Sequence, residues 1–115
     1  MPYKIYHNTR CRKSRGGLQY LNNKGITPEI VDYLKDEPFT EKTLTEIISI
    51  LGIKPKELIR TQEADYRQTL KDQNLSDKEW IKILVENPKF IRRPIIVKGD
   101  KAVIGDILEN IDALL

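Results

Sequence analysis

Four short runs rich in β-branched and aromatic residues constrain this fold more than any other feature, because the connections between them are so different. The first two runs, residues 3–6 and 28–33, leave room for one helix between them. A single crossover helix predicts a parallel pair of strands with a right-handed connection. The last two runs, residues 94–97 and 101–104, are separated only by the turn at residues 98–100, which predicts an antiparallel hairpin.

Helical patterns accompany each strand pair. A first helix is expected after Cys11, running to about Asn23, and the residues from His7 to Arg10 are expected to form the loop before it. A last helix is expected from Gly105 onward, with Asp106 as its N-cap. Its inward-facing residues should be Ile107, Leu108, Ile111 and Leu114.

The middle of the chain predicts a helical insertion at about residues 38–88. Thr40 can cap a helix that ends at Gly52, a short polar helix is expected over residues 63–70, and Ser76 with Glu79 forms a capping-box pattern. The expected order is therefore strand–helix–strand, helical insertion, strand–strand–helix. This order predicts an α/β fold with a mixed four-stranded sheet in one domain, residues 1–115.

Composition excludes several classes of protein. The 115 residues contain one cysteine and one histidine, too few for an internal disulfide or a Cys/His zinc site. No run approaches the ~18 apolar residues of a membrane span, and the first residues lack the apolar core of a signal peptide. We therefore expect a cytoplasmic protein without membrane attachment, in which thiols stay reduced. We also expect a monomer with no tightly bound cofactor.

Positive charge is concentrated at the front of the chain. Residues 1–28 carry six cations and no acid, whereas the rest carries 14 cations and 17 acids, so the net charge of +3 arises at the front. A long basic stripe would suit nucleic acid, but a short basic segment favours a compact site for a small anion.

Cys11 lies inside that basic segment, where the first loop meets the first helix. Unpaired N–H groups and the positive end of the helix dipole stabilise a thiolate there, and Arg10, Arg12 and neighbouring cations add charge. A free cysteine is commonly a small buried apolar residue, but charged flanks argue against that role here. The pattern predicts a nucleophilic thiolate that shares a positive pocket with an anionic substrate.

Other candidates are less specific. His7 could tune the thiol or act as a base, although a lone histidine is more often structural, and Ser14 could hydrogen-bond the thiolate from the first helical turn. Arg93 precedes Pro94, and a cis peptide bond there would present its planar guanidinium to an oxyanion. A solvated surface charge is the ordinary alternative for any single arginine.

Three ordered blocks resemble the glutaredoxin-coupled arsenate reductase family. The first is His7-x3-Cys11-x3-Arg15, the second is Leu58-Ile59-Arg60-Thr61-Gln62-Glu63, and the third is Asn87–Val97 with its Arg93-Pro94 pair. The resemblance covers nearly the whole chain. It implies a thioredoxin/glutaredoxin-like fold with a helical insertion.

The resemblance also implies a mechanism. Cys11 would attack arsenate, with His7 and Ser14 in catalytic roles, while the substrate oxygens are held by Asn8, Arg15, Arg60 and Arg93. Glutathione, a co-substrate, would then reduce arsenic and leave a mixed disulfide on Cys11 or its equivalent on the arsenical. Glutaredoxin would resolve it, which suits a chain without a second cysteine.

One departure keeps alternatives open. The family commonly carries a third arginine after the hairpin, where this chain has Gly105-Asp106, and a carboxylate there would repel an oxyanion. Arg10 and Arg12 are candidates for the missing charge. Two alternatives are a thiol-dependent reductase of another substrate and an Spx-type adaptor that binds RNA polymerase. Ser14, three residues after Cys11, excludes the dithiol-switch form of such an adaptor.

Overall fold

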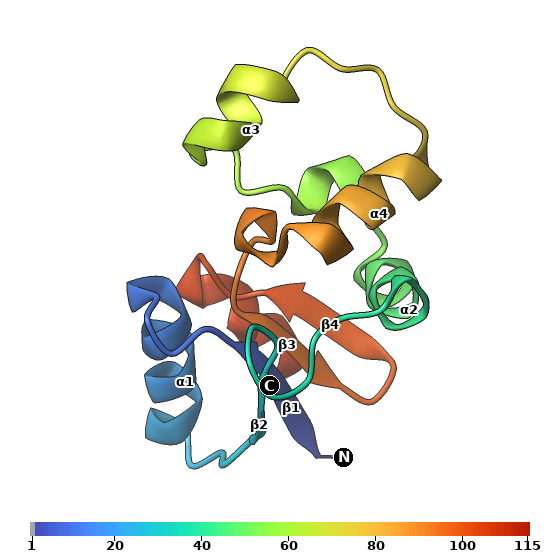
Figure 1. Ribbon diagram of the computed structural model, residues 1–115. Coiled ribbons are helices and arrows are strands. Elements are labelled where there is room, and N and C mark those ends of the chain that lie inside the picture. Colours follow the sequence, from blue (N-terminus) through green and yellow to red (C-terminus); the bar gives the residue numbers. More distant parts are fainter. Residues whose placement is uncertain (1) are drawn as a thin grey trace. The chain divides into compact units, whose positions relative to one another are not determined.

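The computed structural model describes residues 2–115 and has the expected alternation of strands and helices. Figure 1 shows the elements in chain order. They are β1 (Tyr3–His7), α1 (Arg12–Asn23), β2 (Glu29–Asp32), α2 (Glu41–Leu51), η1 (Pro55–Leu58), α3 (Ala64–Thr69), α4 (Asp77–Glu86), η2 (Pro88–Phe90), β3 (Ile95–Lys98), β4 (Lys101–Ile104) and η3 (Leu108–Leu114), where η marks a 3₁₀ helix.

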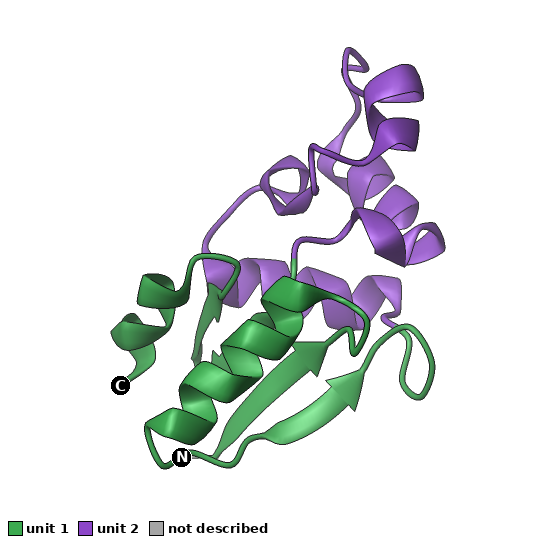
Figure 2. Cartoon of the chain, turned by 90° about the vertical axis from the view of Figure 1, so that its left-hand side faces the viewer, with its two compact units in different colours: residues 1–38, 93–115 green, residues 39–92 purple. Residues whose placement is uncertain are grey.

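The chain forms two compact units (Figure 2). The sheet unit combines the N-terminal part, through Pro38, with Arg93–Leu115, and the helical unit is Phe39–Arg92. The helical unit includes most of the stretch for which the sequence predicts an insertion.

The sheet unit contains four strands in the order β2-β1-β3-β4. Strands β1 and β2 are parallel, with Ile5 opposite Ile30, whereas β3 is antiparallel to both β1 and β4. The parallel pair, the antiparallel hairpin and the mixed four-stranded sheet are all confirmed. Each follows from the length of its connection, one helix in the first case and a two-residue turn in the second.

One face of the sheet carries the core of this unit. Ile5 from β1 and Ile96 from β3 pack with Leu21 of α1, and η3 adds Ile111 and Leu114. Figure 2 shows α1 lying across the sheet. Burying these side chains on one face holds α1 in place, so the residues at its first turn have a fixed position relative to the ends of β1 and β3.

Two predictions about the sheet unit are wrong. His7 is the last residue of β1, not part of the loop, because its backbone continues the parallel pairing opposite Asp32. The final helix is a 3₁₀ helix whose N-cap is Ile107 instead of Asp106. Its period of three buries Ile111 and Leu114 but leaves Ile107 at 56% and Leu108 at 38% exposure, contrary to the expected inward face.

The helical unit begins and ends its helices where the sequence predicts. The Thr40 side chain accepts a hydrogen bond from the Thr43 N–H, and Gly52 ends α2 in the left-handed conformation, with φ of 69°. In α4, the Ser76 hydroxyl accepts from the Glu79 N–H, and Glu79 accepts in return from the Ser76 N–H. Both helices therefore satisfy their first N–H groups within the chain.

Candidate active site

Cys11 is the N-cap of α1, which confirms its predicted position at the start of the first helix. Its N–H donates to the Asn8 carbonyl at 3.0 Å and closes a tight turn, while its own carbonyl accepts from the Arg15 N–H at 3.0 Å. The side chain is buried. Cys11 therefore joins a fixed turn to the first helical turn, where free backbone N–H groups can stabilise an anion.

Asn8 and Ser14 hold this turn together from inside. The buried Ser14 hydroxyl accepts from the Asn8 N–H at 3.0 Å, and the Asn8 side-chain oxygen accepts from the Arg10 N–H at 3.0 Å. The Ser14 hydroxyl thus has a structural partner in the loop. These bonds set the backbone that presents the Cys11 sulfur.

Arg93 is brought to Cys11 by the pairing of the central strands. In the antiparallel register Tyr6 lies opposite Ile95, so the residues just before β3 lie beside the residues just after β1. The Arg93 guanidinium Nε donates to the Cys11 Sγ at 3.4 Å, although the two residues are 82 positions apart. The peptide bond between Arg93 and Pro94 is cis, and Arg93 is only 8% exposed.

The electrostatic surroundings of Cys11 favour its thiolate. Burial by itself raises the pKa of the thiol, but the hydrogen bond from Arg93 and the backbone N–H groups of Ser14 and Lys13 lower it. The positive charge of Arg93 lowers it further. The net result is a pKa below that of an ordinary thiol, so a larger share of Cys11 is nucleophilic at neutral pH.

His7 lies in the interior at the end of β1, with 4% of its surface exposed, and its Nδ1 is buried without a hydrogen-bond partner. Burial lowers the pKa of His7, while the carboxylate of Asp32 acts in the opposite direction and the charge of Arg15 acts in the same direction. The imidazole is therefore neutral at physiological pH and retains one free ring nitrogen.

The cations that neighbour Cys11 in the sequence are exposed, whereas Arg93 is buried. Arg10, Arg12, Lys13 and Arg15 are all exposed at the surface. The Arg15 guanidinium donates to the Thr9 carbonyl at 3.4 Å, on the outside of the turn. The guanidinium that reaches the sulfur thus comes from the residues just before β3, whereas the cations adjacent to Cys11 in sequence are exposed to solvent.

A close approach between α1 and the residue after Arg93 was not singled out by the sequence. A Cβ added at Gly17 would lie 2.6 Å from the Pro94 ring, whereas one added at Gly16 would meet nothing within 4 Å. Two successive glycines inside a predicted helix are the signal that could have indicated it, because glycine is otherwise unfavourable there. Gly17 allows α1 to pack directly against Pro94.

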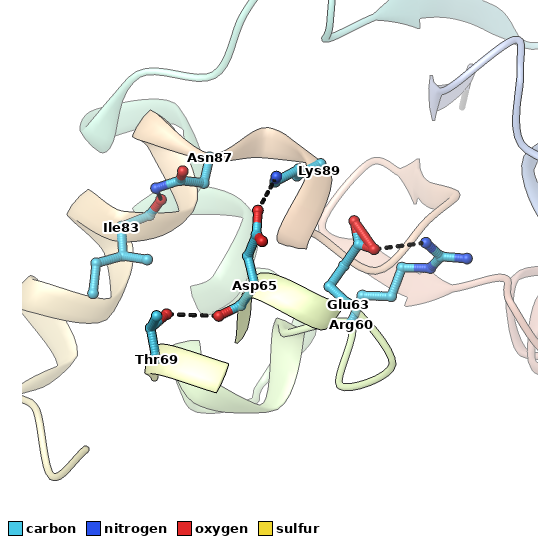
Figure 3. A network of polar contacts seen from close by, with 7 residues as sticks. All are labelled: Arg60, Glu63, Asp65, Thr69, Ile83, Asn87 and Lys89. Atoms are coloured by element: carbon cyan, nitrogen blue, oxygen red, sulfur yellow. Dashed lines mark hydrogen bonds and ion pairs between the residues drawn. The ribbon is translucent and has the colours of Figure 1, made fainter. Parts of the chain in front are cut away.

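Arg60 belongs to the helical unit, where it follows η1. Its guanidinium forms an ion pair with Glu63 at 3.6 Å, and its N–H donates to the Phe90 carbonyl at 2.6 Å. Figure 3 shows this pair beside a second one, in which Lys89 contacts Asp65. Arg60 is thus held by a neighbouring carboxylate and by a bridge between the segments around Ile59 and Ile91.

Asp106, which stands where the resemblance predicts a third arginine, is half-buried in the turn between β4 and η3. The expected role of Asp106 as helix cap is not observed, since Ile107 occupies that position. The preceding Gly105 is buried, and its N–H donates to the Pro94 carbonyl at 2.8 Å.

Two features are absent from residues 2–115. Within that range, no three His, Cys, Asp or Glu side chains are grouped in a way that could hold a metal ion. None of the helices in the same range is both long and apolar enough to cross a membrane.

Comparison with known proteins shows what this chain is similar to. Residues 6–114 match the family model described as "ArsC family". A protein of Escherichia coli strain K12, named "Uncharacterized protein YfgD", is 44% identical over 104 residues, which cover 89% of this chain and 87% of that protein. An "Arsenate reductase" of Haemophilus influenzae is 39% identical, over 96% of this chain and 97% of the relative.

A solved structure agrees with this match. The chain superposes on an "Arsenate reductase from Vibrio cholerae" with a TM-score of 0.90 and 35% identity, over 100% of this chain and 98% of the other. The α/β, thioredoxin-like architecture predicted from the sequence is therefore confirmed by a fold that matches along the whole chain.

Proposed function

The chain belongs to the ArsC family, and on this premise we propose that it reduces arsenate to arsenite through Cys11, with glutathione and glutaredoxin as reductants. The observation that carries the proposal is the 3.4 Å hydrogen bond from the Arg93 Nε to the Cys11 Sγ at the first turn of α1. It places a thiolate and a planar cation together, which is the pair that attack on an oxyanion requires.

In the first step, the Cys11 thiolate attacks arsenic(V). A sulfur–arsenic bond forms, and one oxygen leaves as water after taking up protons from the medium. The remaining oxygens carry negative charge, which Arg93 can stabilise by hydrogen bonds that require no rearrangement of a buried side chain. From the family resemblance, we also assign substrate-binding roles to Asn8, Arg15 and Arg60.

In the second step, the glutathione thiolate attacks the sulfur of Cys11. A disulfide bond forms, the sulfur–arsenic bond breaks, and its electron pair stays on arsenic, which leaves as arsenite. Glutaredoxin then takes the glutathione from the mixed disulfide and returns Cys11 to its thiolate. An external thiol is required because the sequence contains only one cysteine.

His7 and Ser14 act on this chemistry through the turn that carries Cys11. Ser14 fixes the loop through the Asn8 N–H, and the neutral His7 side chain is buried at the end of β1, one residue before Asn8. We therefore assign both as positioning residues. The chemistry needs no bound cofactor beyond the two thiol reductants.

The test is arsenate-dependent oxidation of NADPH in the presence of glutathione, glutaredoxin and glutathione reductase. We expect turnover with the wild-type protein and none with Cys11→Ser. Turnover that persists in Cys11→Ser would refute the proposed nucleophile. If the wild-type protein shows no turnover but retains RNA polymerase in a pull-down, the adaptor alternative replaces the proposal.

A further inference from the structure

A pocket next to the Cys11 turn differs in charge from an oxyanion site. We propose that this pocket is the docking subsite for glutathione, the thiol reductant, and this inference rests on the proposed function. The pocket has a volume of about 440 Å³ and lies wholly in the sheet unit. One wall is formed by residues 8–10, and the other by Asp32 with residues 34–36.

The position of the pocket follows from the parallel pairing of β1 and β2. His7 lies opposite Asp32 at the last pair of the register, so the loops that follow the two strands leave the sheet at the same edge. In sheets with parallel strands, ligands commonly bind in the crevice outside the carboxyl ends of the strands. The pocket is formed by just these two loops.

The pocket lies beside the turn that carries the nucleophile. Asn8 lines the pocket, and its carbonyl accepts the Cys11 N–H at 3.0 Å. This hydrogen bond closes a four-residue turn, whose first and last Cα atoms are less than about 7 Å apart. A ligand of tripeptide size in the pocket can therefore extend a thiol toward Cys11.

Both walls are preformed by hydrogen bonds within the chain. The Asp32 carbonyl accepts from the N–H groups of Asp36 at 3.0 Å and Glu37 at 3.1 Å, and the Asp32 side chain accepts from the Leu34 N–H at 3.0 Å. On the other wall, the Asn8 side chain holds the Arg10 N–H. A preformed pocket reduces the entropy that a ligand must lose on binding.

The charges of the pocket identify the class of ligand. Two cations, Arg10 and Lys35, line the pocket together with two acids, Asp32 and Asp36. A simple oxyanion would be repelled by the acids, whereas glutathione carries two carboxylates for the cations and one ammonium group for an acid. Leu34, at 43% exposure, offers apolar surface for its methylene groups.

The test uses thiol–disulfide exchange without arsenate. The Cys11 thiolate attacks one sulfur of oxidised glutathione, forms the Cys11–glutathione disulfide and releases one glutathione thiolate. The rate is compared with that of bis(2-hydroxyethyl) disulfide, which carries no charge. We expect Lys35→Glu to slow the first reaction about three- to tenfold and to leave the second within twofold.

Two variants serve as matched controls. Lys101→Glu makes the same charge change on β4, at the opposite edge of the sheet, and should leave both rates unchanged. Asp36→Asn removes a negative charge, so net electrostatics alone would speed the reaction with the anionic disulfide. The subsite predicts a slower reaction, because the ammonium group loses its partner.

The proposal is overturned if Lys35→Glu changes neither rate, if it slows both reactions equally, or if Asp36→Asn accelerates exchange with oxidised glutathione. The assay does not depend on arsenate. A chain that discriminates between the two disulfides as expected but shows no arsenate turnover would retain the subsite and lose the proposed function. Arsenate turnover without this discrimination would retain the proposed function and overturn the subsite.

Discussion

At the scale of single residues, the reactivity of Cys11 depends most on Arg93. We predict that Arg93→Gln raises the pKa of the Cys11 thiol, because the variant loses both the hydrogen bond and the charge that lower it. The same change should reduce kcat/KM for arsenate by about 100-fold or more, the usual effect of removing one donor to a developing oxyanion. Thiolate absorbance against pH and steady-state kinetics measure the two effects.

Arg92 provides the control for that variant. Its guanidinium donates to the Glu57 carbonyl at 3.1 Å, inside the helical unit. Arg92→Gln makes the same chemical change one residue away and should leave the titration of Cys11 unchanged. If both variants shift the titration equally, a general effect of net charge would account for the low pKa instead.

His7 should make the stability of the protein depend on pH. Burial lowers its folded pKa below the ordinary value of 6.5, so protons bind more tightly to the unfolded chain. Stability is therefore lost as the pH falls through about 6.5, down to the folded pKa. We predict that His7→Gln reduces this loss, as measured by the urea midpoint between pH 7.5 and 5.5.

The comparison is best made in a Cys11→Ser background, because the thiol titrates as well. The sequence has a single histidine, so its imidazole resonance in NMR reports this group alone. A folded-state titration of His7 at or above pH 6.5 would contradict the account.

At the scale of secondary-structure elements, the contact between α1 and Pro94 controls the site. We predict that Gly17→Ala destabilises the protein by about 1–3 kcal/mol, because the new methyl group would overlap the Pro94 ring. Gly16→Ala should stabilise it by about 0.5–1 kcal/mol, since alanine favours the helix and has free space there. Urea unfolding of both variants provides the measurement.

The two glycine variants also separate packing from helix propensity. Gly17→Ala should lower the reactivity of Cys11, because a displaced Pro94 moves the adjacent Arg93. Equal stability changes of the same sign in both variants would show that the close approach has no energetic effect.

Most elements could be predicted from the sequence because their signals are local. The capping residues Thr40 and Ser76 and the stop at Gly52 act within one or two helical turns. The last helix could not be predicted in the same way. It contacts residues far away in the sequence, such as Tyr3, whose hydroxyl donates to the Leu114 carbonyl, and a local pattern does not contain such contacts.

At the scale of the whole molecule, part of the site could be predicted from local sequence signals and part depends on contacts between distant residues. The position of Cys11 at a helix start follows from the sequence around it. Its contact with Arg93 arises from the antiparallel pairing of β1 with β3, which spacing alone does not reveal. The sequence indicates Arg93 only as a residue that could bind an oxyanion. The charged pocket beside the turn was missed because its second wall, residues 34–36, carries no motif.

The central claim is that arsenate is reduced by two thiols, those of Cys11 and glutathione, which become joined in a mixed disulfide. Its most direct test incubates the protein anaerobically with arsenate and reduced glutathione, without glutaredoxin, followed by intact mass spectrometry and assay of arsenite. We predict one glutathione bound per chain through Cys11, with one arsenite released for each. No adduct, or the same amount of adduct when arsenate is left out, would contradict the account.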